Sequence, residues 1–354
     1  MSGVPEIDVS VLLAAAPGRL TADPGVDPEQ LAAAARAIDA ACRDVGFFTI
    51  VGHGIDADAR ARLDRLSRDF FVRPEAEKAE IAMARGGRAW RGWFPVGGEL
   101  TSGVPDLKEG LYFGAELGAD DPHVRAGTPM HGPNLFPREP AALRDAVLAH
   151  LDAMTRVGQA VLAGMALGLG LEPSWFVDHL TTDPLILFRI FHYPQAAPPP
   201  PTAPQDGTED RWGVGEHTDY GLLTLLGQDG NAGLEVHIPD GGWVAVDARP
   251  DRFVCNVGDM LERLTGGRYR STPHRVRNTS GAERLSFPFF LDPAWDARVE
   301  RLPIVDRPSD DGAAARWDRT SVHGFTGTYG DYLLAKVGRV FPELADAVVP
   351  RAEL

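Results

Sequence analysis

The spacing of apolar residues divides the chain into a first part with helical periodicity and a second part built from short strands. After Asp27, apolar residues recur every three or four positions up to Gly46, which predicts a helix that Asp27 caps and Gly46 ends. The same period predicts helices over residues 56–72 and from about 140 to 170. We therefore expect residues 4–135 to form an N-terminal, mostly helical region, with one short buried strand in GFFTIVGHGI (46–55).

The pattern changes near residue 183, where short apolar runs alternate with turn residues such as Gly, Asp and Asn. Evenly spaced short strands are typical of a sandwich, barrel or jelly roll. We predict long connecting helices over residues 140–180, a β domain over residues 183–294, and a C-terminal extension with one helix over residues 295–354. The predicted fold class is α+β. The predicted strands are LILFRIFHYP (185–194), LLTLL (222–226), LEVHI (234–238), WVAVDA (243–248), FVCNV (253–257), HRVRN (274–278) and LSFPFF (285–290).

Composition and charge exclude several classes of function. The 354 residues carry a formal net charge of −15, and an acidic surface repels both nucleic-acid phosphates and anionic lipids. The longest apolar run, Ala160–Leu171, is too short to cross a bilayer, and the first residues do not resemble a secretory signal. The two cysteines form no disulfide framework. We expect a cytoplasmic protein that binds neither nucleic acid nor membrane.

A candidate metal site begins at His217 and Asp219. Two residues apart on a strand, their side chains point to the same face, and imidazole plus carboxylate supplies two of the three ligands of a facial iron site. His274, 57 residues later in STPHRV, is the candidate third ligand. The alternative is that His217 and Asp219 only hydrogen-bond to each other in a turn.

Arg284 and Ser286 form the second candidate cluster. On a strand they share one face, whereas Leu285 and Phe287 share the other. A buried arginine requires an anion, and a planar guanidinium beside a hydroxyl suits a carboxylate. The alternative is an internal salt bridge with one of the many acidic residues.

Together these residues resemble the isopenicillin N synthase-like branch of the non-haem Fe(II)/2-oxoglutarate oxygenases. The resemblance covers most of the chain, since further motifs follow in the same order. These motifs are VPEIDVS (4–10), ACRDVGFFTIVGHGI (41–55), RPEAEKAEI (73–81), DLKEGLYFG (106–114), GPNLFP (132–137), GLEV (233–236), GGWVAV (241–246) and NVGDMLERLTGGRYRSTPHRV (256–276).

The resemblance implies a double-stranded β-helix, or jelly roll, with N-terminal helices and a C-terminal helix packed on it. It assigns the metal to His217, Asp219 and His274. It assigns the distal carboxylate of 2-oxoglutarate to Arg284 and Ser286, joined by Tyr193 in HYP. Plant members often carry Asn two residues before this tyrosine, where this chain has Phe191, so one polar contact to the cosubstrate is expected to be missing or replaced.

The activity implied by the resemblance is oxidation of a small molecule by O₂ at Fe(II), through hydroxylation, desaturation or cyclisation, with 2-oxoglutarate converted to succinate and CO₂. Ascorbate is a candidate reductant. Two enzyme alternatives stay open, namely an oxidase like isopenicillin N synthase, which uses no 2-oxoglutarate, and an ethylene-forming type of enzyme. A third alternative is a jelly roll that binds a keto acid without catalysis.

The segment GGRAWRGWFPVGGEL (86–100) is a candidate substrate loop. It has glycines at both ends and an arginine among aromatic residues, a combination that suits a small amphipathic acid. We expect Arg91 and Trp93 to face the substrate, helped by Trp90 and Phe94. The alternative is that these side chains only pack.

Overall fold

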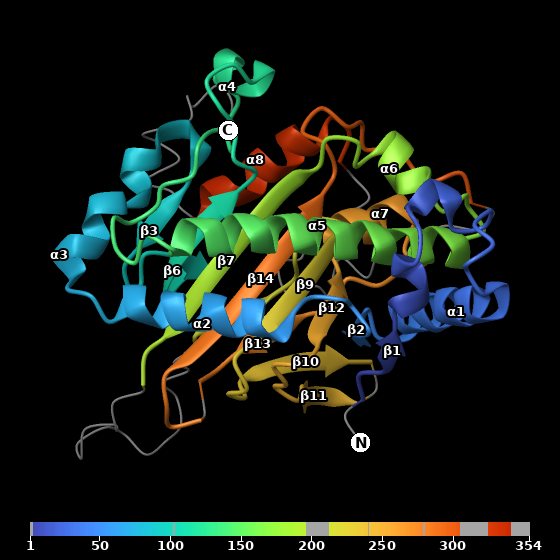
Figure 1. The fold of residues 1–354 in the computed structure, drawn as a ribbon, viewed down its shortest axis with the longest axis horizontal. Helices are drawn as coiled ribbons and strands as arrows, with labels where there is room; N and C mark the ends of the chain where they lie inside the picture. The colour runs from blue at the N-terminus through green and yellow to red at the C-terminus, as the bar shows by residue number, and fades with distance from the viewer. Residues whose placement is uncertain are drawn as a thin grey trace.

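Two β-sheets form the centre of the molecule, and helices cover the outer face of the larger sheet (Figure 1). This computed structural model describes residues 3–101, 103–195, 212–239, 241–278, 280–304 and 325–340. The predicted C-terminal extension over residues 295–354 therefore lies largely outside the described residues. Its predicted helix is present as α8 (Tyr329–Val340).

The large sheet has eight strands, and the small sheet has four. All neighbours in the large sheet are antiparallel except its first two strands. In spatial order the large sheet contains β1 (Glu6–Asp8), β2 (Phe47–Val51), β12 (Phe253–Val257), β9 (Leu223–Gln228), β14 (Arg284–Asp292), β7 (Leu185–Tyr193), β6 (Glu109–Gly114) and β3 (Gly92–Phe94). The small sheet contains β11 (Gly242–Ala245), β10 (Leu234–Ile238), β13 (His274–Val276) and β8 (Val214–His217), and a hairpin joins β4 (Leu100–Thr101) to β5 (Val104–Pro105).

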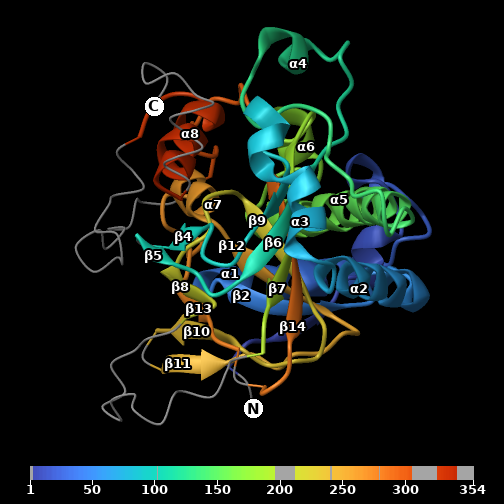
Figure 2. The same ribbon diagram turned by 90° about the vertical axis from the view of Figure 1, so that its left-hand side faces the viewer.

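The helices gather mainly on one side of the large sheet. The longest, α5 (Leu143–Gly168), crosses its outer face with α2 (Ala57–Phe71) and α1 (Pro28–Asp44) packed beside it (Figure 1). Seen from the side, α8 lies near α7 and the β4–β5 hairpin (Figure 2). The short helices are α3 (Glu75–Lys78), α4 (Pro122–Ala126), α6 (Trp175–His179) and α7 (Asp259–Leu264), with 3₁₀ turns at Ser10–Leu13, Pro17–Arg19, Ala79–Ile81 and Met83–Ala89.

Local sequence explains the first helix. The Asp27 carboxylate accepts hydrogen bonds from the backbone N–H groups of Glu29 and Gln30, which satisfies donors that the helix itself leaves open. Pro28 fits the first helical position because no helical hydrogen bond is needed there. The helix ends before Gly46, whose φ of +74° turns the chain into β2. The predicted cap and end of this helix are both confirmed.

The N-terminal region is less helical than its sequence pattern predicts. Besides helices it contributes β1, β2, β3 and β6 to the large sheet, so it supplies both edges of that sheet. The predicted strand within residues 46–55 is confirmed as β2, while the other three are additions. Two of these are only three residues long, too short to show a periodicity.

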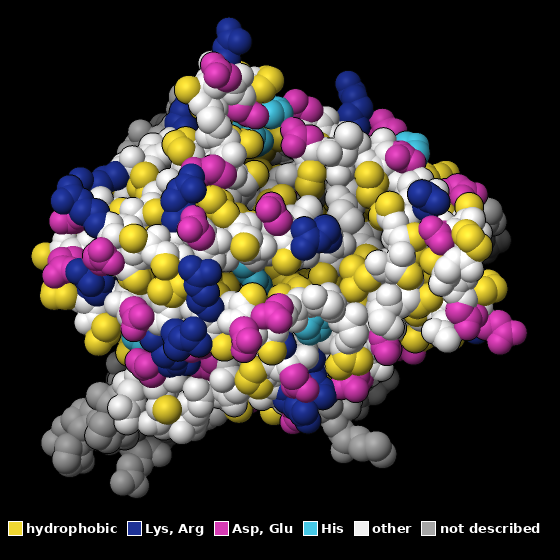
Figure 3. Space-filling model, viewed as in Figure 1, with side chains coloured by type: hydrophobic (Ala, Val, Ile, Leu, Met, Phe, Trp, Pro, Cys, Tyr) yellow, Lys and Arg dark blue, Asp and Glu magenta, His cyan; other side chains and the backbone are white. Residues whose placement is uncertain are grey.

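The fold as a whole confirms the predicted α+β jelly roll. The two longest strands, β7 and β14, are almost fully buried because a cavity between the two sheets lies on one face and helices cover the other face of the sheet (Figure 1). In the described part of the chain, no helix is long and apolar enough to cross a membrane. On the face shown in Figure 3, acidic and basic side chains are interspersed.

Candidate active site

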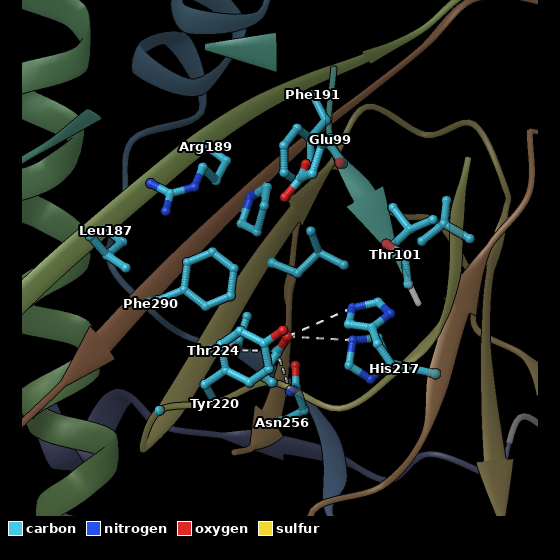
Figure 4. A pocket seen from close by; sticks show the side chains of 18 of the residues that line it. Glu99, Thr101, Leu187, Arg189, Phe191, His217, Tyr220, Thr224, Asn256 and Phe290 are labelled. Atoms are coloured by element: carbon cyan, nitrogen blue, oxygen red, sulfur yellow. Dashed lines mark hydrogen bonds and ion pairs between the residues drawn. The ribbon is translucent and has the colours of Figure 1, made fainter. Parts of the chain in front are cut away.

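Three donor atoms converge at one wall of the central cavity. The Asp219 Oδ1 atom lies 3.8 Å from Nε2 of His217 and 3.8 Å from Nε2 of His274. All three ligand atoms lie within 4.8 Å of one another, close enough to share one ion (Figure 4). Two imidazoles and one carboxylate on one face are a donor set for a divalent first-row metal such as Fe(II).

The small sheet places these residues, but not quite as the sequence indicates. His217 ends β8 and His274 begins β13, and the two are direct partners across the antiparallel pair. Asp219 lies in the turn after β8, so the expectation that it shares a strand with His217 is wrong. Its backbone carbonyl accepts a hydrogen bond of 2.7 Å from the N–H of Asp259, which anchors the turn on α7. The turn brings the carboxylate back toward both imidazoles.

Hydrogen bonds behind the three ligands fix their orientation. Nδ1 of His217 lies 2.8 Å from the carbonyl of Gly215, and Nδ1 of His274 lies 3.2 Å from the carbonyl of Thr272. These contacts place the ring proton on Nδ1 and leave the Nε2 lone pair free for a metal.

The two carboxylate oxygens of Asp219 also have separate roles, one in orienting the side chain and one in facing the metal site. Its Oδ2 atom accepts hydrogen bonds of 2.5 Å from Thr224 and 2.7 Å from Asn256, while Oδ1 faces the histidines. Burial alone would raise the pKa of Asp219, but His274, His217 and the two donors hold it below its usual value. Burial and the nearby His217 lower the pKa of His274 to about 4. Near neutral pH the site is therefore a carboxylate with a neutral His274 ring, as metal binding requires.

The second candidate cluster lies on the large sheet, on the neighbouring strands β14 and β7. Arg284 pairs with Tyr193 in the register of these strands, and its guanidinium carbon lies 4.7 Å from the centre of the tyrosine ring. The Ser286 hydroxyl lies 3.4 Å from the Tyr193 hydroxyl. All three side chains line the cavity, as the predicted strand alternation requires.

The surroundings of Arg284 fit a carboxylate ligand. The residue is 0% exposed, and its Nε and Nη2 atoms donate to the carbonyl of Asn231 and to Oε1 of Gln228. Its Nη1 atom is buried without a partner, although an unpaired buried donor is costly. Among the described residues no carboxylate forms an ion pair with Arg284, which argues against the salt-bridge alternative. A bound carboxylate would supply the missing acceptor.

A buried ionic cluster beside Tyr193 was not found by sequence reasoning. The Lys108 ammonium lies 2.8 Å from Oε2 of Glu99, contacts the Asp106 carboxylate, and sits 4.7 Å from the centre of the Phe191 ring. Tyr112 donates to the other oxygen of Glu99. Lys108 belongs to the motif DLKEGLYFG, but only the fold shows that this motif faces the cavity. The Lys108 ammonium thus lies over the ring of Phe191, the residue at which the sequence predicts that a polar contact to the cosubstrate is missing or replaced.

The expectation for the loop over residues 86–100 needs correction. Trp90 lines the cavity, but Arg91 and Trp93 are not among its lining residues. The Trp93 indole donates to Oε2 of Glu109, which also binds Lys78 at 2.7 Å outside the cavity. Arg91 is buried and donates to the carbonyl of Met130. The local backbone path sets these directions, and composition alone does not reveal them.

A facial site of two histidines and one carboxylate inside a jelly roll defines the class of non-haem iron oxygenases. Residues 4–139 match the family described as the non-haem dioxygenase N-terminal region in morphine synthesis, and residues 186–293 match the 2OG-Fe(II) oxygenase superfamily. A Dictyostelium discoideum protein named as a probable iron/ascorbate oxidoreductase is 45% identical over 88% of this chain and 90% of its own length.

Two further proteins are similar along most of the chain. A homoarginine-6-hydroxylase of Arabidopsis thaliana is 34% identical over 94% of this chain and 96% of its own length. A full-length Neurospora crassa protein, solved in complex with alpha-KG, is 25% identical and superposes with a TM-score of 0.73 over 95% of this chain and 96% of that chain. The chain belongs to the 2OG-Fe(II) oxygenase superfamily.

The family resemblance and the fold predicted from sequence are therefore confirmed. The protein is an Fe(II)- and 2-oxoglutarate-dependent dioxygenase, and its cofactors are iron and 2-oxoglutarate. Ascorbate as a reductant agrees with the name of the Dictyostelium relative.

Proposed function

We propose that this dioxygenase holds its iron through His217, Asp219 and His274 and hydroxylates a small molecule. The observation that carries the assignment is the convergence of Asp219 Oδ1 with two Nε2 atoms whose rings are already fixed through Nδ1. Hydroxylation is favoured among the possible oxidations because the Arabidopsis relative is named as a hydroxylase.

The cosubstrate half of the proposal rests on Arg284, Ser286 and Tyr193. The unpaired Nη1 of Arg284 would donate to the distal carboxylate of 2-oxoglutarate, and the Ser286 and Tyr193 hydroxyls would supply further donors. When bound, iron and 2-oxoglutarate supply the oxidising chemistry with O₂, leaving succinate and CO₂. The protein's own residues fix the cosubstrate and exclude water from the apolar walls of the cavity.

The test is metal content and turnover of single variants. His217→Ala, Asp219→Ala and His274→Ala should each lose bound Fe(II) and succinate formation while keeping the circular dichroism spectrum of the wild type, because the jelly roll has its own core. His237→Ala is the matched control, since this histidine is exposed on the same small sheet. Wild-type iron content in any of the three variants would remove that residue from the ligand set.

The same assay separates the alternatives predicted from sequence. An enzyme like isopenicillin N synthase would consume O₂ without producing succinate, and a binding protein would bind 2-oxoglutarate without either reaction. Ethylene in the headspace would indicate the ethylene-forming type. We expect succinate and a hydroxylated product in equal amounts.

A further inference from the structure

The cavity has a second half that neither the metal ligands nor the 2-oxoglutarate residues occupy. Its walls are largely apolar, and the polar side chains near them are Arg189, Tyr112, Glu99 and Asp292. Leu187, Arg189 and Phe290 lie on the flank opposite His217 (Figure 4). The lining residues on this side are Trp90, Tyr112, Met130, Leu187, Arg189, Phe290, Leu333 and Val337.

Arg189 is a buried cation whose hydrogen-bond partners are neutral. It is 6% exposed and lies on β7, on the same face as Tyr193. Its guanidinium carbon lies 3.4 Å from the centre of the ring of Tyr112, whose side chain is also a hydrogen-bond partner. Its hydrogen bonds to the carbonyls of Phe113 and Phe188 are long, at 3.4 Å each. Within the described ranges no carboxylate forms an ion pair with it.

Glu99 and Asp292 lie near Arg189 in the cavity lining, but neither forms an ion pair with it, and burial raises the pKa of Asp292 to about 7. Glu99 and Asp106 are both engaged with Lys108. A second guanidinium, that of Arg91, lies close enough that burial and Arg189 together lower the pKa of Arg91 to about 9, and two of its nitrogens have no partner. Two neighbouring buried guanidinium groups with no carboxylate in direct contact are costly, so an anionic ligand would relieve an existing penalty.

We propose that the substrate is an organic acid whose carboxylate binds Arg189, with its carbon skeleton against Leu187 and Phe290. The inference rests on the proposed function and specifies its substrate class. The bound acid would not be 2-oxoglutarate, because Arg189 lies four residues from Tyr193 along β7, roughly 13 Å at about 3.3 Å per residue. An acid held at Arg189 points the far end of its skeleton across the cavity toward His217.

The test is ligand binding to the full chain, which does not depend on turnover. The probes are hexanoate, octanoate, 4-phenylbutanoate and 6-aminohexanoate, each paired with its methyl ester, titrated calorimetrically with 2-oxoglutarate at saturation. At least one acid should bind the wild type more tightly than its ester. Arg189→Met should weaken that acid roughly 10- to 150-fold, as expected for one charge-assisted contact, and leave the ester unchanged.

Two variants keep the result interpretable. Arg189→Lys should recover part of the affinity because it keeps the charge. Arg144→Met is the matched control, since Arg144 also stacks on an aromatic ring, 5.4 Å from the centre of Phe136, but lies outside the cavity lining. Equal binding of acids and esters, no binding of any acid, or full affinity in Arg189→Met would overturn the inference. Failure of the proposed function would appear separately, as absent 2-oxoglutarate binding in the wild type.

Discussion

At the scale of single residues, the site depends on buried polar side chains that keep one hydrogen-bond donor without an acceptor in the protein. Arg284 is the clearest case, since two of its nitrogens are satisfied and the third, Nη1, is buried and free. Strand alternation made Arg284 and Ser286 predictable as a pair. Arg189 was not predictable from the sequence. Its proposed role depends on the lack of a paired carboxylate among the described residues, and only the fold shows which side chains lie near it.

Arg284→Ala should raise the KM for 2-oxoglutarate roughly 10- to 150-fold, the value of one charge-assisted hydrogen bond. The KM of Arg284→Lys should fall between those of the wild type and Arg284→Ala, because a lysine keeps the charge but lacks the planar guanidinium. Initial-rate kinetics of succinate formation measure both. An unchanged KM in Arg284→Ala would mean that the cosubstrate carboxylate binds elsewhere.

Asn256 is a residue that sequence reasoning missed, because it lies on β12 and reaches Asp219 across the fold. Asn256→Leu should lower metal affinity roughly 10- to 100-fold, since Asp219 loses one of the donors that orient it. Titration with Mn(II) measures the effect, and Gln159→Leu, which removes a hydrogen bond to Thr181 on the helical side, is the control. Unchanged affinity would show that Thr224 orients the carboxylate alone.

At the scale of elements, prediction succeeded where the signal is local. The helix over residues 28–44 carries its cap, its first-turn proline and its apolar stripe within one segment. β3 and β6 were missed because much of their evidence is non-local. β6 pairs with β7, which is distant in the chain, and β3 in turn pairs with β6. The turn that holds Asp219 was missed for the same reason, since its anchor is the N–H of Asp259.

The N-cap of α1 provides a test at this scale. Asp27→Ala should lower the free energy of unfolding by about 1 kcal/mol, because the N–H groups of Glu29 and Gln30 lose their acceptor. Asp27→Asn keeps an acceptor and should cost much less. Denaturant unfolding measures both, and an equal loss in the two variants would point to the charge of Asp27 and not to its cap.

At the scale of the whole molecule, buried histidine couples stability to pH. Burial and the nearby Arg60 lower the pKa of His150 to about 4, whereas a histidine in the unfolded chain titrates near 6.5. The unfolded state therefore binds the extra proton first as the pH falls. His150 should withdraw roughly 3 kcal/mol of stability between about pH 6.5 and 4 and none above that range.

His150→Leu should remove this part of the acid loss. The measurement is the free energy of unfolding of the wild type and of His150→Leu at several pH values. The difference between the two proteins is compared, so that the contributions of other titrating groups cancel. His179→Leu is the control because that histidine is exposed on α6. Parallel pH profiles for wild type and His150→Leu would show that folding does not lower the pKa of His150.

The order of strands in the large sheet has a consequence for how the chain avoids aggregation. Residues 6–114 place β1 and β2 beyond β12 at one side, and β6 and β3 beyond β7 at the other. A chain beginning at residue 140 would leave the backbone donors and acceptors of β12 and β7 without partners along both margins of the sheet. Such bare margins recruit strands from other molecules, so the shortened protein should precipitate as an intermolecular β-structure. The strands of the N-terminal region thus protect both edges of the sheet from pairing with other molecules.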